Sequence, residues 1–327
     1  MAIALCLGAL CTLLLVSLAV GSRDLSPSEV WSGLIGRGAA RPTVASIIVW
    51  ELRMPRTALA LAAGASLAVA GVVMQALTRN PLAEPGILGV NAGAALAVVA
   101  SMSLLGLTTV REYLWFAFAG AAAAAVLVHI MASRTGRAGP ARLVLAGVAL
   151  GASLGAITGT ITMYDTDAFS SYRFWVVGSL EGRDAGLLAW VWPFLAAGMV
   201  LALVSGHALN ALALGEEQAT ALGAHLGRVR LVALASITLL CGASTAAIGP
   251  ISFVGLVVPH ALRLALGADQ RLLLGACLIA GPVLLLVADI IGRLVIRPDE
   301  MEAGVVAAFV GGPVLLLMVL RPQGEAA

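Results

Sequence analysis

Apolar runs long enough to cross a lipid bilayer recur along the whole chain. About ten can be marked out, at Ala2–Val20, Thr57–Leu77, Ile87–Leu107, Leu114–Ser133, Leu143–Met163, Leu187–Ser205, Leu231–Gly249, Ile251–Leu262, Leu272–Gly292 and Ala303–Leu320. A hydrocarbon core needs about 20 apolar helical residues, and backbone groups in lipid must bond within their own helix. Ile251–Leu262 is too short and contains Pro259, so it is expected as a short or broken helix. The runs predict an all-α polytopic membrane protein with about ten transmembrane helices in a single domain, residues 1–327.

Composition supports this class and excludes others. Hydrophobic residues make up 61% of the 327 residues and charged residues only 11%, against about 25% charged residues in soluble domains. All 19 basic residues are arginine, since the chain contains no lysine. This excludes the lysine of a P-loop ATPase and any Schiff-base lysine. No nucleic-acid partner is expected for such a chain.

Side chains that could carry catalysis or bind a metal do not form a recognisable group. No Ser/His/Asp set, paired carboxylates or zinc-type spacing occurs, and the histidines His129 and His260 lack companions at ligand spacing. The cysteines lie inside apolar runs, as expected of packing residues; they are Cys6, Cys11, Cys241 and Cys277. We therefore expect no catalytic residue, no metal site and no cofactor in this chain.

Arginines predict which ends of the helices face the cytoplasm. The connection between the fourth and fifth runs holds Arg134, Arg137 and Arg142 without any acid. Short loops rich in arginine remain on the cytoplasmic side. Placing this loop inside puts both termini and the stretch Leu209–Arg230 inside as well. The first run, Ala2–Val20, is interpreted as a retained helix, with a cleaved signal peptide as the alternative.

The stretch Leu209–Arg230 is the longest polar interruption in the C-terminal half. Apolar residues recur in it at helical spacing, and its glycines divide it into short helical pieces. Glu216 lies in an expected first turn, where an acid suits the helix dipole. The pattern fits a compact surface outside the bilayer that a partner holds. A linker that touches only lipid headgroups is the alternative.

Two further features have open interpretations. Prolines and a glycine interrupt the apolar pattern at Asn80–Gly86, which fits either a constriction of a transport pathway or a tight turn. Asp289 lies within the ninth run, where an acid is a functional candidate, although Arg293 four residues later favours a structural ion pair. The sequence G-A-S-x-A-x-x-G occurs at Gly64–Gly71 and again at Gly242–Gly249. Five runs apart, the two copies would cross in opposite directions, which predicts a weak inverted repeat. Chance similarity is the alternative, because small residues are common in packed membrane helices.

Six segments in a fixed order resemble a known family. They are Arg53–Arg56, Thr78–Ala94 (TRNPLAEPGILGVNAGA), Arg173–Arg183 (RFWVVGSLEGR), Gly215–Gly223 (GEEQATALG), Gly249–His260 (GPISFVGLVVPH) and Ala288–Arg293 (ADIIGR). Together they resemble the FecCD-type permease subunits of type II ABC importers for ferric siderophores, haem and cobalamin. The segments TRNPLAEPGILGVNAGA and RFWVVGSL are more similar to ferric-siderophore permeases than to cobalamin permeases.

The resemblance implies an architecture and a set of partners. Such permeases have ten transmembrane helices in the bacterial cytoplasmic (inner) membrane, with both termini cytoplasmic. Two permease chains, identical or homologous, pair around a pathway, and two cytoplasmic ATPase subunits bind ATP and Mg. An extracytoplasmic binding protein delivers the substrate. This chain would then have no ATPase site of its own.

The resemblance also implies roles for particular residues. The stretch 209–230 corresponds to the element that couples to the ATPase, at positions Gly215, Glu216, Ala219, Leu222 and Gly223, with Ala219 and Leu222 against the ATPase. A cytoplasmic gate would involve Asn80 and Leu82, whereas the second gate element, here Gly139-Pro140-Ala141, offers no gating side chain. Docking of the binding protein would involve exposed arginines at the outer rim, namely Arg53, Arg56 and Arg293.

The predicted function is therefore ATP-driven import of an iron(III)–siderophore by alternating access. Haem or cobalamin import by a member of the same family is the nearest alternative. An ion-coupled secondary transporter would need a chain of intramembrane ionisable residues, of which Asp289 is the one clear candidate. An intramembrane enzyme would need the catalytic group that the chain lacks.

Overall fold

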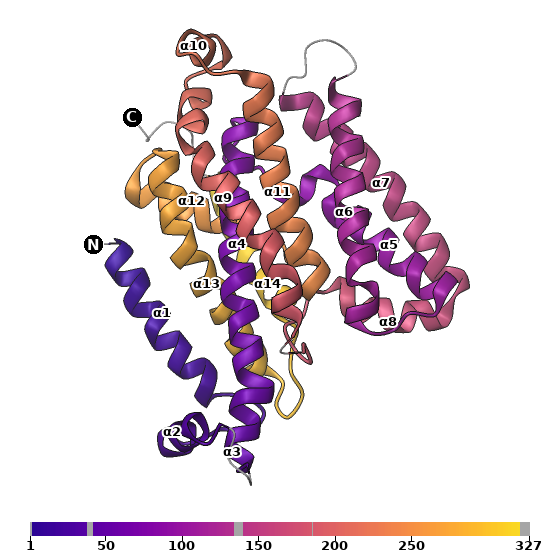
Figure 1. The fold of residues 1–327 in the computed structure, drawn as a ribbon, viewed down its shortest axis with the longest axis vertical. Coiled ribbons are helices and arrows are strands. Elements are labelled where there is room, and N and C mark those ends of the chain that lie inside the picture. Colours follow the sequence, from indigo (N-terminus) through magenta and orange to yellow (C-terminus); the bar gives the residue numbers. More distant parts are fainter. Residues whose placement is uncertain (1, 38–41, 134–139, 185, 321–327) are drawn as a thin grey trace.

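Ten helices form the bundle and correspond to the ten apolar runs. The computed structural model describes residues 2–37, 42–133, 140–184 and 186–320, and no strand occurs among them. The helices are α1 (Ala2–Ala19), α4 (Met54–Thr78), α5 (Val90–Leu105), α6 (Val110–Ser133), α7 (Pro140–Tyr164), α9 (Leu187–Ala213), α11 (Leu226–Ile248), α12 (Val254–Leu266), α13 (Gln270–Val295) and α14 (Ala303–Leu320) (Figure 1). The all-α class and the approximate number of spans are confirmed.

Six membrane-spanning candidates reach full length within the described residues, and the other apolar helices are shorter. The longest candidate runs over Val44–Thr78, because α3 (Val44–Ile47) and a π-helical turn η1 (Ile48–Arg53) continue directly into α4. The short helix α12 contains Pro259 and follows the non-helical segment 249–253. A short eighth helix was expected there, and the structure confirms it.

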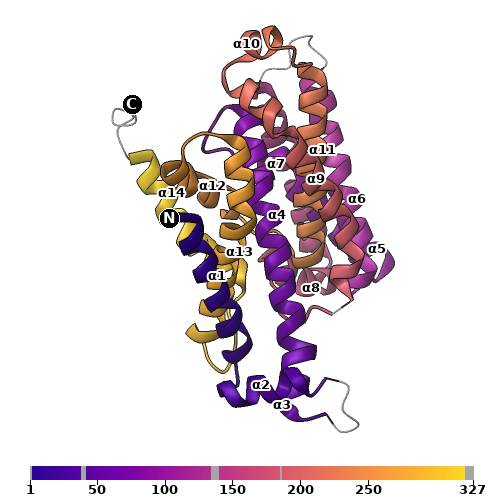
Figure 2. The ribbon, with the colours of Figure 1, turned by 60° about the vertical axis from the view of Figure 1, so that its left-hand side comes forward.

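Short helices lie at the ends of the bundle. α10 (Glu216–Ala221) lies at one end, and α2 (Pro27–Ile35) lies with α3 at the other (Figures 1 and 2). α2 begins at Ser26, whose side chain accepts from the backbone of Glu29 while Glu29 bonds back to the backbone of Ser26. This reciprocal pair satisfies two backbone donors at the helix start. α8 (Thr166–Val176) lies below α5 to α7, opposite α10.

The helix α4 is the centre of the bundle. Every residue from Ser66 to Thr78 is buried, and α4 packs against α9, α11, α12 and α13. It runs towards the α10 end whereas α11 runs away from it, so the two similar segments cross in opposite directions as expected. Glycine contacts bring these helices close, as small residues do in membranes. A Cβ on Gly64 would lie only 2.8 Å from Gly281.

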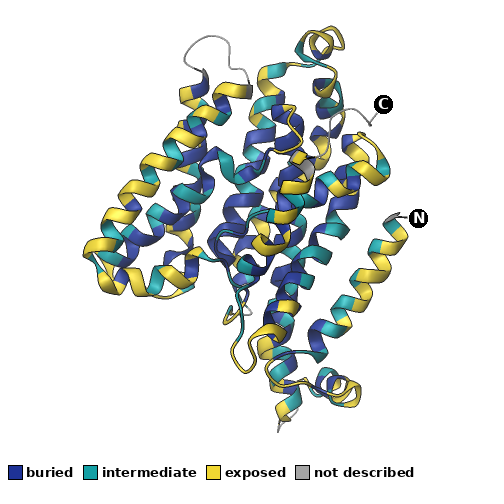
Figure 3. Cartoon of the chain, turned by 180° about the vertical axis from the view of Figure 1, so that it is seen from behind, coloured by how far each residue is buried: buried dark blue, intermediate teal, exposed yellow. Residues whose placement is uncertain are grey.

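Helices at the periphery expose most of their apolar surface. In Val44–Thr78, 78% of the most apolar window is buried, against 17% in Ala141–Tyr164. Figure 3 shows the same contrast between a buried centre and exposed outer helices. Between Ile3 and Ala19 of α1 the only buried residues are Ser17 and Leu18, at its C-terminal end. Lipid is the surrounding that makes such faces stable.

Replacing Gly71 with alanine should destabilise the bundle, because the added Cβ would collide with the backbone carbonyl of Gly255 on α12. Overpacking of a rigid contact costs about 1–3 kcal/mol or more. The matched control is Gly159→Ala on α7, where nothing lies within 4 Å of the added Cβ. The melting temperatures of both variants are measured in detergent. Equal melting temperatures would contradict the close α4–α12 contact.

Candidate functional site

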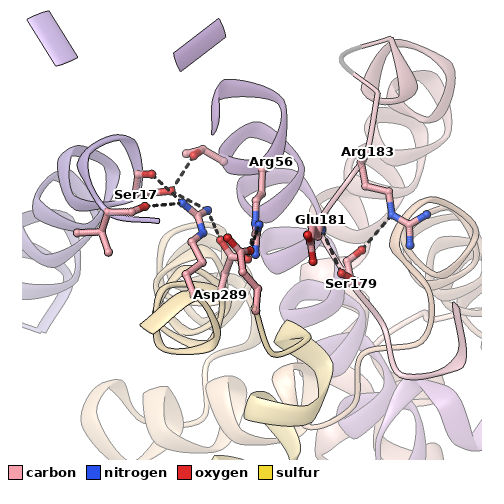
Figure 4. A network of polar contacts seen from close by, with 10 residues as sticks. Ser17, Arg56, Ser179, Glu181, Arg183 and Asp289 are labelled. Carbon is pink, nitrogen blue, oxygen red and sulfur yellow. Dashed lines mark hydrogen bonds and ion pairs between the residues drawn. The ribbon is translucent and has the colours of Figure 1, made fainter. Parts of the chain in front are cut away.

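Arginines from two distant parts of the chain gather around two acids at the end opposite α10. This arginine cluster consists of Arg53, Arg56 and Arg293 with Asp289 and Glu300, and Figure 4 shows Arg56 beside Asp289. Arg56 Nε donates to Asp289 Oδ1 at 2.8 Å, and Arg293 pairs with the other oxygen of the same carboxylate. Arg56 Nη1 also pairs with Glu300, on the connection before α14. The predicted Asp289–Arg293 ion pair is confirmed, with Arg56 as a second cation.

Two of these arginines close the end of α1. Arg293 Nη1 donates to the carbonyl of Ser17 at 2.8 Å and of Val20 at 3.2 Å, and Arg53 donates to the carbonyls of Leu18 and Arg23. The last carbonyls of a helix lack partners within it and carry partial negative charge. Guanidinium groups from α13 and from the start of α4 therefore cap α1 from outside.

The expectation that all three arginines are exposed at the rim is wrong. Arg53 is 5% exposed and Arg293 is 2% exposed, while the side chain of Arg56 is 11% exposed. The physical reason is that the carbonyls of α1 and the buried Asp289 draw the guanidinium groups inward. The sequence does not reveal that α1 ends beside α13. A role in docking a partner remains a prediction, for which Arg56 is the most accessible of the three.

The arginine cluster borders an open cavity of about 510 Å³. Acids and arginines from the turn after α8 line it as well, including Glu181, Arg183 and Asp184. Partial desolvation raises the pKa of Glu181, and the neighbouring Glu300 adds to this effect. The cavity is thus lined by both guanidinium groups and carboxylates, an arrangement suited to binding a charged side chain of a partner.

At the opposite end, a turn over residues 79–89 joins α4 to α5, and we call it the gate turn. Asn80 Oδ1 accepts from the backbone of Leu82 at 3.0 Å. Asn80 and Leu82 are exposed, whereas Ala83, Pro85 and Leu88 are buried. The first half is therefore a tight turn, and the second half is packed inside the protein. A constriction of a transport pathway at this segment stays a prediction. Gly139, in the second gate element, lies outside the described residues, as do Arg134 and Arg137.

The coupling stretch 209–230 is more helical than the sequence indicates. α9 continues to Ala213 and α11 already begins at Leu226, so α10 and its flanks are the part outside the long helices. The reason is that Leu209 and Leu212 stay buried and extend the packed face of α9. Gly215 and Gly223 adopt φ values of +113° and +85°, which other residues rarely adopt. Both glycines permit the sharp turns on either side of α10.

A salt bridge and a buried alanine fix α10 in place. Glu216 accepts from Arg230 Nη2 at 2.6 Å, which ties the start of α10 to α11. Ala219 is 0% exposed, so its expected contact with an ATPase is wrong. A six-residue helix that packs against α9 and α11 must turn one face inward, and Ala219 lies on that face. Leu222, the C-cap residue of α10, is 68% exposed, so its expected contact with an ATPase stays a prediction.

Residues with polar contacts between distant segments that the sequence did not single out include Glu300, Ser17 and Glu84. The signal for Glu300 was the acidic connection between the last two spans, with Asp299, Glu300 and Glu302 in four residues. Within the described part of the chain, no three His, Cys, Asp or Glu side chains lie where they could hold a metal ion.

Comparison with known proteins places these features in a family. Residues 9–321 match the FecCD transport family. The ferric enterobactin transport system permease protein FepD of Escherichia coli (strain K12) is 46% identical over 308 residues, covering 94% of this chain and 91% of that protein. The vitamin B12 import system permease protein BtuC of Yersinia enterocolitica is 40% identical over 320 residues, covering 94% and 89%.

A solved structure shares the fold over its whole length. It is described as a metal-chelate type ABC transporter in an inward-facing conformation, and it superposes with a TM-score of 0.84 at 26% identity, covering 97% of this chain and 98% of that one. The resemblance drawn from the six ordered segments is thereby confirmed. The chain belongs to the FecCD transport family of ABC importer permeases.

Proposed function

We propose that this chain is the permease subunit of an importer that takes up an iron(III)–siderophore, driven by ATP hydrolysis in a separate subunit. The observation that carries the proposal is the 46% identity to a ferric enterobactin permease over 94% of the chain. The absence of lysine from the sequence agrees with a nucleotide site elsewhere. ATP and Mg would bind to the partner ATPase subunits.

The partners follow from the two ends of the bundle. Two ATPase subunits would bind on the cytoplasmic side, one at α10 of each permease chain. The second permease is an identical or homologous chain. An extracytoplasmic binding protein would dock at the opposite end, above the cavity beside the arginine cluster. α1 runs away from the α10 end and α14 runs towards it (Figure 2), which supports cytoplasmic termini in the bacterial inner membrane.

Cobalamin is the second candidate substrate, because a vitamin B12 permease is 40% identical over a similar length; haem follows as the third substrate of the family. An ion-coupled mechanism finds less support, since two arginines neutralise the buried Asp289. The deciding experiment reconstitutes the complex in vesicles and compares uptake of a ferric siderophore, haem and cobalamin. We expect ATP-dependent uptake of the ferric siderophore alone, and we expect ATP hydrolysis only when the ATPase subunit is present. Uptake of cobalamin instead would overturn the substrate assignment.

Replacing Glu300 with glutamine should speed the docking of an acidic binding protein. Glu300 now neutralises part of the charge on Arg56, so its removal leaves Arg56 more attractive to a partner carboxylate. Charge changes at a rim act mainly on the association rate, and an effect of about two- to fivefold at low salt is expected.

The matched control for this docking test is Asp299→Asn, the same charge change on the same connection. Asp299 is exposed, and no ion pair joins it to Arg56 among the described residues. Rapid-mixing measurements over a range of ionic strength compare the two variants. Equal acceleration by both would show that only net charge matters, and would count against Arg56 as a docking residue.

A further inference from the structure

The carboxylate of Glu84 holds the gate turn to another helix. Its Oε1 accepts from the backbone N–H of Phe253 at 2.8 Å, across 169 positions of sequence. Phe253 is the N-cap residue of α12, whose first N–H groups have no partner within the helix. Among the described residues no arginine forms an ion pair with Glu84. The carboxylate is thus committed to the start of α12, where the helix dipole favours an anion.

Phe253 itself is fixed on two sides. Its φ is +71°, a left-handed conformation that is uncommon for a bulky residue and marks a constrained position. Its ring lies against α14, because a Cβ on Gly311 would come within 2.6 Å of the ring atom Cδ1. The backbone of Phe253 is therefore held by Glu84, and its ring by α14.

The second half of the gate turn is wedged between α12 and α7. A Cβ on Gly255 would lie 2.9 Å from Pro85 Cδ, and a Cβ on Gly147 of α7 would collide with the carbonyl of Ile87. The last turn of α4 is also hydrogen-bonded to α12, since Gln75 Nε2 donates to the carbonyl of Gly255 at 3.3 Å. The exposed half, with Asn80 and Leu82, projects from this fixed base.

We propose that Glu84 is a positioning residue of the transport cycle, which sets the place of the gate turn by anchoring it to the start of α12. The contact of Phe253 with Gly311 extends the anchor to α14. A displacement of α12 or α14 is then passed to Leu82 through the hydrogen bond of Glu84 to Phe253 and the close contacts of Gly255 with Pro85 and of Gly311 with Phe253. This assignment rests on the proposed function and on the family resemblance, which implies that Asn80 and Leu82 belong to a gate.

The experiment compares Glu84→Ala with Glu84→Gln in the complete complex, reconstituted in vesicles with its ATPase and binding protein. Glutamine keeps an acceptor oxygen at the same place, so it should preserve the anchor, whereas alanine removes it. For Glu84→Ala we expect backbone amide exchange in residues 79–89 and 249–256 to rise about tenfold. We also expect fewer chelate molecules imported per ATP hydrolysed, with hydrolysis itself retained. Glu84→Gln should behave as the wild type in both measurements.

A second pair of variants approaches the same link from α14. Gly311→Ala forces the ring of Phe253 to move, whereas Gly312→Ala on the same helix meets nothing within 4 Å. Gly311→Ala should lower the number of chelate molecules imported per ATP hydrolysed, and Gly312→Ala should leave it unchanged. This pair tests the anchor even if Glu84→Ala fails to fold.

Three outcomes would overturn the proposal. They are unchanged exchange in Glu84→Ala, raised exchange with normal coupling, and glutamine as harmful as alanine. Failure of the proposed function would appear differently, as a wild-type complex that hydrolyses ATP without importing any chelate. The exchange measurements on the gate turn still report on the anchor in that case.

Discussion

Replacing Leu222 with arginine should detach the ATPase subunits and abolish uptake while the permease stays folded. Leu222 is 68% exposed at the end of α10 and has no role in packing the bundle. Fully burying a leucine side chain on assembly contributes about 1.5–3 kcal/mol. An arginine there would lose this contact and would also bury a charge without a partner. The expected weakening of the permease–ATPase complex is about 30-fold or greater.

Co-purification of the ATPase and substrate uptake in vesicles measure this effect. The matched control is Leu105→Arg. Leu105 is the last residue of α5 and is 58% exposed, at the end of the bundle opposite α10. That variant should retain the ATPase. If Leu222→Arg also retains both the ATPase and uptake, α10 is an interfacial linker and not a coupling element.

Ala219→Arg is a different experiment, although it changes the same helix. Because Ala219 is fully buried against its own chain, an arginine there must displace α10 before any partner is met. We expect uptake to fall in this variant through loss of the local structure. Amide exchange of α10 in the isolated permease distinguishes the two causes, since it should rise for Ala219→Arg and stay unchanged for Leu222→Arg.

Replacing Asp289 with asparagine should destabilise the permease more than any other change of a single charge. The carboxylate is 0% exposed and lies between Arg56 and Arg293. Without its charge the two guanidinium groups face each other with little compensation. Removing one partner of a buried ion pair costs about 3–5 kcal/mol.

The control for this prediction is Asp24→Asn, which breaks the exposed pair of Asp24 with Arg297. Exposed ion pairs contribute little to stability because water screens them. This variant should therefore have the same melting temperature as the wild type. Thermal unfolding in detergent compares the three proteins. A melting temperature of Asp289→Asn equal to that of the wild type would show that the buried pair does not hold the helices.

The spans could be predicted from the sequence because lipid imposes one simple requirement on each of them. The ends of the helices could not, since they depend on packing. Leu209 and Leu212 look like part of a polar interruption, yet they are buried and prolong α9. Ala219 and Leu222 both fall at helical spacing, and spacing alone does not say which of them faces inward.

The charged residues show the same limit. Arg53 and Arg293 stand beside membrane-spanning runs and could be exposed by any local criterion, but the end of α1 lies against them in the fold. Asp289 was recognised as a pair of Arg293 because its partner is four residues away, whereas Arg56 is 233 residues away. Glu84 lies inside the segment Asn80–Gly86, and the sequence does not show which residue it contacts. The one local sign is an acid between Ala83 and Pro85.

The capping of α1 has a consequence for the order in which the chain becomes secured during its synthesis. α1 is made before α13, and the guanidinium group that binds the carbonyl of Ser17 belongs to a residue 276 positions later. Arg53, which binds the carbonyl of Leu18, follows only 35 positions later, and the hydroxyl of Ser17 lies 2.8 Å from that of Thr57 on α4. Until α13 has entered the membrane, the carbonyls of Ser17 and Val20 depend on water and headgroups for the hydrogen bonds that Arg293 later donates. The end of α1 is therefore fixed in two stages, first by the start of α4 and then by α13.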